Sequence, residues 1–336
     1  GAAVDLVAIS GGIGYVVLTN NVLVVMDLSD PAQPARLAEV DVPWRASRLR
    51  AAGRRLLFAD PWGMGVIDVA TPARPIVDRS AYVDLDVRPE PAVKQSSWVG
   101  AAGGGDTFVH VSDDVPLSVV ALAGGRLRRR ANVPMPPQLL AWDVAVAGTD
   151  AYVADVNYAV ERIDVADPAA PVVAARHTST TGQARDVAVE GDRAFALFDG
   201  ALVEFDRGPA LLPVAATLSL PENTKTSLAV AGGRAYVTAA EPWLLIVDAP
   251  RGGPMRELGR FGHGEFAEDV VVAGDVAYLA VPNVGLVAVD IADPASPREL
   301  GRLAWDRHSQ RLALDGTRLY VVTTGEGCCD ERVEVL

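Results

Sequence analysis

The sequence repeats with a period of about 42 residues, which limits the chain to folds built from similar small units. An acidic residue closes each of a series of short apolar runs, except that alanine closes the third. These positions are Asp27, Asp68, Ala121, Asp164, Asp206, Asp248, Asp290 and Glu334, with steps of 41, 53, 43, 42, 42, 42 and 44 residues. A second series of bulky residues gives the same count, at Tyr15, Leu57, Phe108, Tyr152, Phe195, Tyr236, Tyr278 and Tyr320. The sequence therefore predicts eight units.

Each unit contains four short strand-like segments, as residues 269 to 303 illustrate. "DVVVAG", "DVAYLAV", "GLVAVDI" and "PRELGRL" follow one another with turn residues between them. Four strands in a repeat of this length are typical of a propeller blade, because packing blades face to face buries surfaces that one meander would expose. We expect an all-β, eight-bladed β-propeller of four-stranded antiparallel blades, with residues 1–336 in a single domain. The step of 53 residues is assigned to a loop enlargement around residues 84 to 107.

The last blade is expected to be incomplete. Residues 310 to 336 supply three strands, "QRLALD", "RLYVVTT" and "RVEVL", and only "GAAV" precedes the first strand of the first blade. We therefore expect the natural chain to extend beyond one end, with the missing strand supplied from there or left unfilled.

Three stretches carry a resemblance to a known family. "VLVVMDLSDPAQPARLAEV", "RIDVADPAAPVVAAR" and "GLVAVDIADPASPRELGRL" resemble LVIVD repeats, which form propellers and occur mostly in secreted or surface-attached bacterial and archaeal proteins. The resemblance implies the fold and an extracytoplasmic location, whether secreted, periplasmic or at the cell surface. It transfers no catalytic residue, since the motif residues are structural. Asp27, Asp164 and Asp290 are expected to bond the backbone of the Asp-Pro turns that they begin.

Charge and hydropathy restrict the partners. The formal net charge is −13, so phosphate backbones are repelled and no nucleic-acid partner is expected. The same acidity favours a cationic or polar partner. The longest purely aliphatic runs have four or five residues, as in "VLVVM" at 22 to 26, whereas a membrane-spanning helix needs roughly 20 apolar residues. No transmembrane segment is expected in this chain.

The candidate binding residues lie in loops that share one face of a propeller, between the fourth strand and the next first strand. They are Trp44, Arg48, Lys94, Trp142, Asp143, Arg185, Asp186, Glu268 and His308. Aromatic and charged side chains together are typical of recognition surfaces. We expect a non-enzymatic interaction module that presents this face to a protein, peptide or glycan, in some cases as part of a larger surface assembly. No catalytic residue, metal or cofactor is assigned.

Two alternatives stay open. One is a hydrolase- or lyase-type enzyme with a carboxylate and metal site at the channel mouth, although motifs such as GxSxG and HExxH are absent from the sequence. The other is a structural spacer within a larger surface protein.

The two cysteines, Cys328 and Cys329, are adjacent in the sequence. Outside the cytoplasm we expect them to form a vicinal disulfide, strained because adjacent Cα atoms are only about 3.8 Å apart. The alternative is two free thiols for a soft metal or redox chemistry, which the neighbouring acidic residues disfavour because they raise thiol pKa values.

Overall fold

The structure is a computed structural model. It describes residues 4–10, 13–18, 21–27, 29, 35–43, 48–52, 54–60, 63–85, 99–104, 107–112, 117–123, 126–133, 141–180, 182–206, 212–221, 225–239, 242–262, 266–304, 308–315, 318–324 and 331–335. Trp44, Lys94, Cys328 and Cys329 lie outside these residues, as does much of the expected enlargement between residues 84 and 107. The chain divides into two compact units, Gly1–His177 and Thr178–Leu336.

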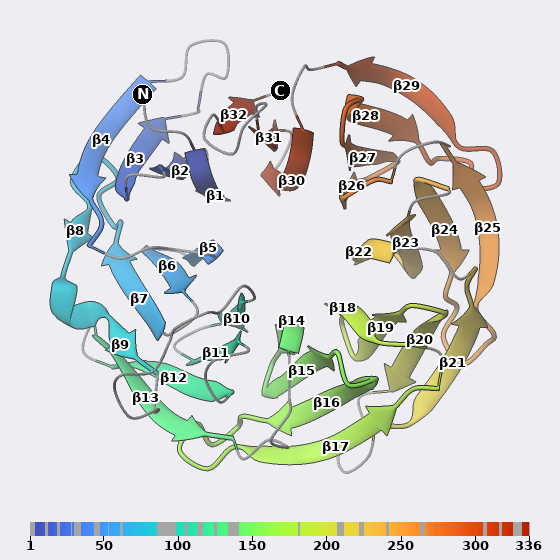
Figure 1. Ribbon diagram of the computed structural model, residues 1–336, viewed down its shortest axis with the longest axis horizontal. Helices are drawn as coiled ribbons and strands as arrows, with labels where there is room; N and C mark the ends of the chain where they lie inside the picture. Colours follow the sequence, from blue (N-terminus) through green and yellow to red (C-terminus); the bar gives the residue numbers. More distant parts are fainter. Residues whose placement is uncertain are drawn as a thin grey trace. The chain divides into compact units, whose positions relative to one another are not determined.

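The first unit contains consecutive antiparallel sheets (Figure 1). The first sheet is β1 (Val4–Ser10), β2 (Ile13–Leu18), β3 (Val22–Asp27) and β4 (Ala35–Asp41). The second begins with β5 (Arg48–Ala52), β6 (Arg55–Asp60) and β7 (Gly63–Asp68). The third is β10 (Val99–Gly104), β11 (Thr107–Ser112), β12 (Ser118–Ala123) and β13 (Arg126–Asn132). The fourth is β14 (Ala141–Ala147), β15 (Asp150–Asp155), β16 (Ala159–Asp164) and β17 (Val172–Thr178).

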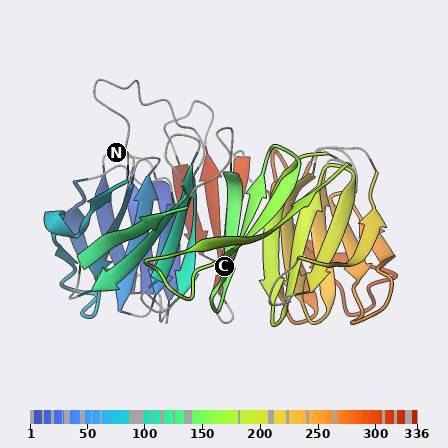
Figure 2. The same ribbon diagram turned by 90° about the horizontal axis from the view of Figure 1, so that it is seen from below.

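The second unit repeats this organisation. Its sheets are β18 (Ala184–Glu190), β19 (Arg193–Phe198), β20 (Ala201–Asp206) and β21 (Val214–Ser219), then β22 (Lys225–Ala231), β23 (Arg234–Ala239), β24 (Leu244–Asp248) and β25 (Arg256–Phe261). The next is β26 (Asp269–Ala273), β27 (Val276–Val281), β28 (Gly285–Asp290) and β29 (Arg298–Leu303). In the described residues the last sheet has three strands, β30 (His308–Asp315), β31 (Arg318–Thr324) and β32 (Glu331–Val335). The turned view shows the strands of each sheet lying side by side (Figure 2).

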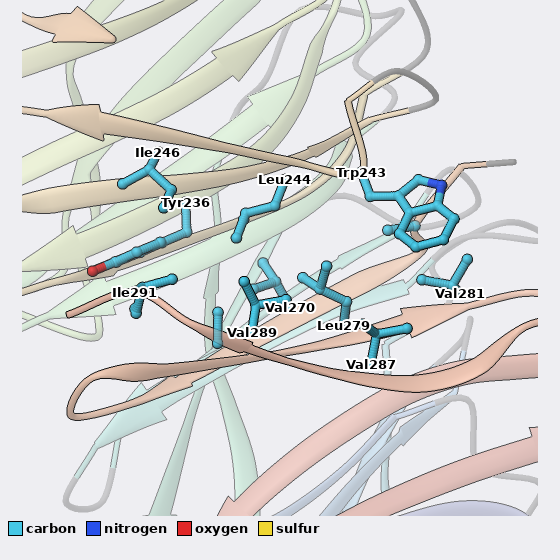
Figure 3. Packing of buried hydrophobic residues seen from close by; sticks show 12 residues of the cluster. Tyr236, Trp243, Leu244, Ile246, Val270, Leu279, Val281, Val287, Val289 and Ile291 are labelled. Atoms are coloured by element: carbon cyan, nitrogen blue, oxygen red, sulfur yellow. The ribbon is translucent and has the colours of Figure 1, made fainter. Parts of the chain in front are cut away.

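The core of each unit lies between neighbouring sheets. In the second unit, Tyr236 and Ile246 of one sheet pack with Leu279, Val287 and Val289 of the next (Figure 3). In the first unit, the first and second sheets bury a similar cluster. Burying a leucine, valine or phenylalanine side chain stabilises a fold by about 1.5–3 kcal/mol, so stacked sheets bury what a single sheet would leave in water. The prediction of an all-β fold of four-stranded antiparallel sheets is confirmed.

The Asp-Pro sequence that recurs in the turns between third and fourth strands has the predicted structural cause. Asp27, Asp164 and Asp290 each accept a hydrogen bond from the backbone N–H two residues ahead, at 2.9, 2.9 and 3.0 Å. Such a bond stabilises the turn in which proline fixes the next φ. These carboxylates therefore act in turn formation, as the sequence predicts.

The second sheet differs from its neighbours at its outer side. Its outer strand is split into β8 (Ile76–Val77) and β9 (Val83–Asp84), which both pair with β7 and are separated by the 3-10 helix η1 (Arg79–Ala81). Tyr82 follows this helix, stacks on Phe58 and donates a hydrogen bond to Asp60. The lengthening of the second repeat thus begins before residue 84, within the fourth strand itself.

Candidate interaction face at the starts of the first strands

The first strands of several sheets begin with a β-bulge. The register shifts between Ala141 and Asp143 in β14, and between Ala184 and Asp186 in β18. A similar shift occurs at the start of β22. A bulge leaves one residue unpaired and changes the direction of its side chain. The bulged residues of β14 and β18 are Trp142 and Arg185, both half-buried and both among the predicted binding residues.

In the second unit, aspartates near the starts of first strands form hydrogen bonds to the first strand of the next sheet. Asp186 accepts the N–H of Leu228 at 2.8 Å, and Asp269 accepts the N–H of Leu312 at 3.0 Å. Asp269 also accepts the hydroxyl of Ser227 at 3.0 Å. Each bond spans one repeat in sequence. Asp186 is therefore engaged in the fold through one carboxylate oxygen.

Arg185 is held against the turn between β19 and β20. Its Nε donates to Asp199 at 2.6 Å, and the other carboxylate oxygen of Asp199 accepts the N–H of Gln183 at 3.0 Å. Gly182 makes this approach possible, because it has φ +118° and a Cβ there would lie 2.5 Å from the Cβ of Asp199. The Arg185 side chain is 27% exposed, so it is oriented and still reachable from solvent.

The fourth sheet presents an exposed tyrosine at the same end as Trp142. Asp155, the last residue of β15, pairs with Ala141, and the turn that follows carries Tyr158, which is 50% exposed. Tyr158 has φ 65°, an uncommon and strained conformation for a bulky residue. The equivalent turn of the first sheet has Asn21 with φ 62°, a residue type that tolerates this region. The fold thus exposes an aromatic ring to solvent at a position where asparagine would adopt the backbone conformation with less strain.

A buried charged group lies in the same sheet. Glu161 and Asp155 are each 1% exposed, and the Arg176 guanidinium lies 3.4 Å from a Glu161 oxygen and 3.6 Å from an Asp155 oxygen. Burial, followed by repulsion from Asp155, raises the pKa of Glu161 to about 7, and Arg176 opposes this rise only in part. The Glu161 position is apolar in other repeats, at Val24, Val203, Leu245 and Val287. Glu161 is therefore a titratable group in a core position.

His110 is a second buried titratable group, between the second and third sheets. Its Nε2 lies 2.7 Å from the carbonyl oxygen of Asp60, so Nε2 carries the proton and Nδ1 is an acceptor. Within the described residues Nδ1 has no hydrogen-bond partner. Burial lowers the pKa of His110 to about 4. The ring is therefore neutral near pH 7.

The structure divides the predicted binding residues between the units. Trp142 and Asp143 are adjacent at the start of β14 in the first unit, and Arg48 is the first residue of β5. In the second unit, Arg185 and Asp186 begin β18, Glu268 directly precedes β26, and His308 is the first residue of β30. The Glu268 side chain is half-buried, and its N–H donates to the carbonyl of Ala280 at 2.8 Å.

Two aromatic residues of the turns differ from one another in role. Trp243 is only 7% exposed and packs edge-on to Phe261, whereas Tyr158 extends into solvent. The residue type alone does not show whether an aromatic side chain in a loop is buried, as Trp243 is, or exposed, as Tyr158 is. Tyr158 could have been identified as a bulky residue at a turn position that requires positive φ. That identification requires the register of the turn, which the sequence alone does not give.

The part of the chain that the structure describes contains no group of three or more His, Cys, Asp and Glu side chains placed to hold a metal ion. It also contains no helix with the length and hydropathy needed to cross a bilayer.

Three segments of the chain match a known family of repeats. Residues 1–42, 140–178 and 264–304 match the family described as the LVIVD repeat. These segments include the three stretches on which the resemblance was predicted, so that prediction is confirmed. No curated protein matches the sequence.

Solved structures show which fold the chain resembles. The computationally designed Ika8 protein has 12% sequence identity and a TM-score of 0.76, covering 99% of this chain and 96% of its own. Sqt1 of Saccharomyces cerevisiae has 10% identity and a TM-score of 0.75, with coverage of 100% and 96%. Sqt1 of Chaetomium thermophilum, bound to the N-terminus of the ribosomal protein L10, has 12% identity and a TM-score of 0.72, with the same coverage. At these identities the likeness shows a propeller-type fold alone.

Proposed function

We propose that this chain is a non-enzymatic interaction module that binds a polypeptide segment at the starts of its first strands. The observation that carries the proposal is the exposed Tyr158, held at positive φ at the same end of the fourth sheet as the bulged Trp142. Tyrosine and tryptophan are enriched among the residues that dominate binding energy at protein interfaces. Because this backbone conformation is strained for tyrosine, the presence of tyrosine here supports a functional role for its aromatic ring.

The remaining residues of the proposed face supply polar contacts. In the first unit, Asp143 lies beside Trp142. In the second unit, considered by itself, Arg185, Asp186 and Glu268 lie at the equivalent ends of their sheets. Arg185 is oriented by Asp199, which reduces the entropy lost when a partner fixes it. A relative in fold, the Chaetomium Sqt1, binds the N-terminal segment of another protein, which is the class of partner proposed here.

A peptide selected from a displayed random library against the purified chain provides the probe. Tyr158→Asn and Trp142→Ala should each weaken its binding by about 1–4 kcal/mol in biolayer interferometry, with the melting temperature nearly unchanged. Tyr158→Asn is the sharper variant, because Asn21 occupies the equivalent backbone conformation. Leu300→Ala, which removes an exposed apolar side chain from β29, is the matched control and should bind normally.

Arg185→Ala tests the strand starts of the second unit separately, and it should weaken those selected peptides that bind there. If selected peptides bind Tyr158→Asn, Trp142→Ala and Arg185→Ala all as tightly as the unaltered chain, the strand starts are wrongly assigned as binding surfaces. Selection of glycans in a parallel array, with no peptide recovered, would reject a polypeptide partner.

We also propose that the sheets are eight blades of one propeller domain, with a last blade that lacks its fourth strand in this chain. A single unfolding transition with equal calorimetric and van't Hoff enthalpies would support one domain, and two separable transitions would oppose it. An extracytoplasmic location and a Cys328–Cys329 disulfide belong to the same proposal. Mass spectrometry of unreduced protein tests the disulfide, since two freely alkylated thiols would exclude it.

A further inference from the structure

Arginines on the fourth strands are generally paired with carboxylates of their own sheet. In β29, Arg298 lies 2.8 Å from Asp290 and Arg302 lies 2.5 Å from Glu299. The same arrangement recurs in β25, where Arg256 pairs with Asp248 and Arg260 with Glu257, at 2.9 and 2.5 Å. Arg36 of β4 pairs with Glu39, and Arg176 of β17 pairs with Glu161 and Asp155. The repeat therefore supplies its own countercharge.

The third sheet lacks this compensation. Strand pairing places Arg128 of β13 opposite Ala121, where β29 has Arg298 opposite Asp290. It also places Arg129 opposite Val120, where β29 has Glu299 opposite Val289. One carboxylate has thus become alanine, and the other has become a further arginine.

The result is a row of exposed cations. Four arginines of β13 are exposed, namely Arg126, Arg128, Arg129 and Arg130. Arg79 of η1 is also exposed, and η1 packs beside β13. Figure 1 shows β13 at the outer side of its sheet, next to β9. Within the described part of the chain, no carboxylate forms an ion pair with any of these five arginines.

Acidic residues on the neighbouring strands only partly offset this charge. Asp84 of β9 and Asp68 of β7 border β13, and Asp78 directly precedes η1. Asp68 already accepts the N–H of Ala70 at 2.8 Å. Among the described residues, five arginines thus lie near three carboxylates, in a chain whose formal net charge is −13. We define these five arginines, of β13 and η1, as the arginine edge.

We propose that the arginine edge is a docking surface for a short acidic polypeptide segment of a partner protein. The repeat itself shows which chemistry satisfies these positions, since the equivalent arginines pair with Asp248 of β24 and Glu257 of β25, and with Asp290 of β28 and Glu299 of β29. The planar guanidinium group matches a carboxylate by two parallel hydrogen bonds, which an ammonium cannot provide. A partner's carboxylates would replace the two that the third sheet has lost.

Length and charge favour a short segment over a long polyanion. Seven residues of β13 span about 23 Å at 3.3 Å per residue. A nucleic acid extending beyond that distance would meet the acidic remainder of the surface, which repels it. This surface is distinct from the face that carries Trp142 and Tyr158, and it takes the opposite class of partner from the cationic one expected there.

A fluorescein-labelled octaglutamate peptide tests the proposal by fluorescence polarisation at about 50 mM salt. The unaltered chain should bind it, and binding should weaken at least tenfold at about 200 mM salt because the contacts are ionic. The double variant Ala121→Asp, Arg129→Glu restores the pattern of β29 and should lower affinity at least tenfold. Its melting temperature should equal or exceed that of the unaltered chain, which excludes unfolding as the cause.

A matched control distinguishes the effect of charge at β13 from the effect of net charge on octaglutamate binding. Ala215→Asp, Thr217→Glu and Ser219→Asp on the uncharged strand β21 change the net charge by the same amount and should leave binding within twofold. Failure of the unaltered chain to bind octaglutamate, equal binding by the β13 variant, or equal loss in the β21 variant would each overturn the proposal. Tighter binding of a single-stranded oligonucleotide than of octaglutamate would overturn it as well.

Discussion

Replacing Glu161 should change how the stability of the chain depends on pH. Glu161 is 1% exposed in a position that holds valine or leucine in other repeats, and burial raises its pKa from 4.5 to about 7. A carboxyl group with a raised folded-state pKa binds its proton more tightly when folded than when unfolded. Stability is therefore lost as pH rises from about 4.5 to about 7, and the two pKa values correspond to about 3 kcal/mol.

Glu161→Gln keeps the side-chain shape and cannot ionise. Urea denaturation at pH 5, 6, 7 and 8 should show the variant gaining up to about 3 kcal/mol on the unaltered chain across this range. Glu161→Val, the choice of other repeats, should be at least as stable as the unaltered chain at pH 8. Arg176 is 36% exposed and can be solvated once its partner is gone.

Glu299→Gln is the control for this experiment. The Arg302 guanidinium lowers the pKa of the exposed Glu299, so its removal should affect stability in the opposite sense and weakly. If the unaltered chain and Glu161→Gln give parallel stability curves from pH 5 to 8, Glu161 is not a buried carboxyl group with a raised pKa, and the reasoning fails.

Three further substitutions test other parts of the structure. His110→Leu should remove an acid sensitivity of about 3 kcal/mol, because the folded-state pKa of about 4 makes the unaltered chain lose stability as pH falls from 6.5 to 4; urea titrations at these two pH values check it. Asp269→Ala should cost about 1–3 kcal/mol in urea denaturation and raise the hydrogen-exchange rate of the Leu312 amide, whereas equal exchange would deny the bond. Gly182→Ala should lower the melting temperature, since its φ of +118° and the 2.5 Å approach to Asp199 leave no room for a methyl group; a neutral effect would contradict that geometry.

The regular part of the fold was accessible from the sequence because it depends on local pattern. Alternating apolar runs gave the strands, and Asp-Pro turns such as those at Asp164 and Asp290 use bonds between residues two apart. The split fourth strand of the second sheet was not anticipated, since the bulky residue that anchors it, Tyr82, contacts Phe58 and Asp60 far away in the sequence.

The candidate sites depended on register, which the sequence alone leaves open. Trp142 and Arg185 were placed correctly at the starts of first strands, but the bulges that turn them were not predicted. The arginine edge was visible only as the letters "RLRRR". That these arginines lack carboxylate partners became evident only from the strand pairing, which places Arg128 opposite Ala121. A one-residue change of register would have assigned a different partner to every arginine.

The bonds from Asp186 to Leu228 and from Asp269 to Leu312 also bear on self-association. The first strand of each sheet is an edge strand, and an unpaired row of N–H groups along such an edge can recruit strands from other chains. Each aspartate occupies one of these donors and places a negative charge beside it. An incoming strand would have to displace the carboxylate before it could pair. We therefore expect the residues that join neighbouring sheets also to hinder strand addition at these edges, so that loss of Asp186 or Asp269 should lower solubility as well as stability.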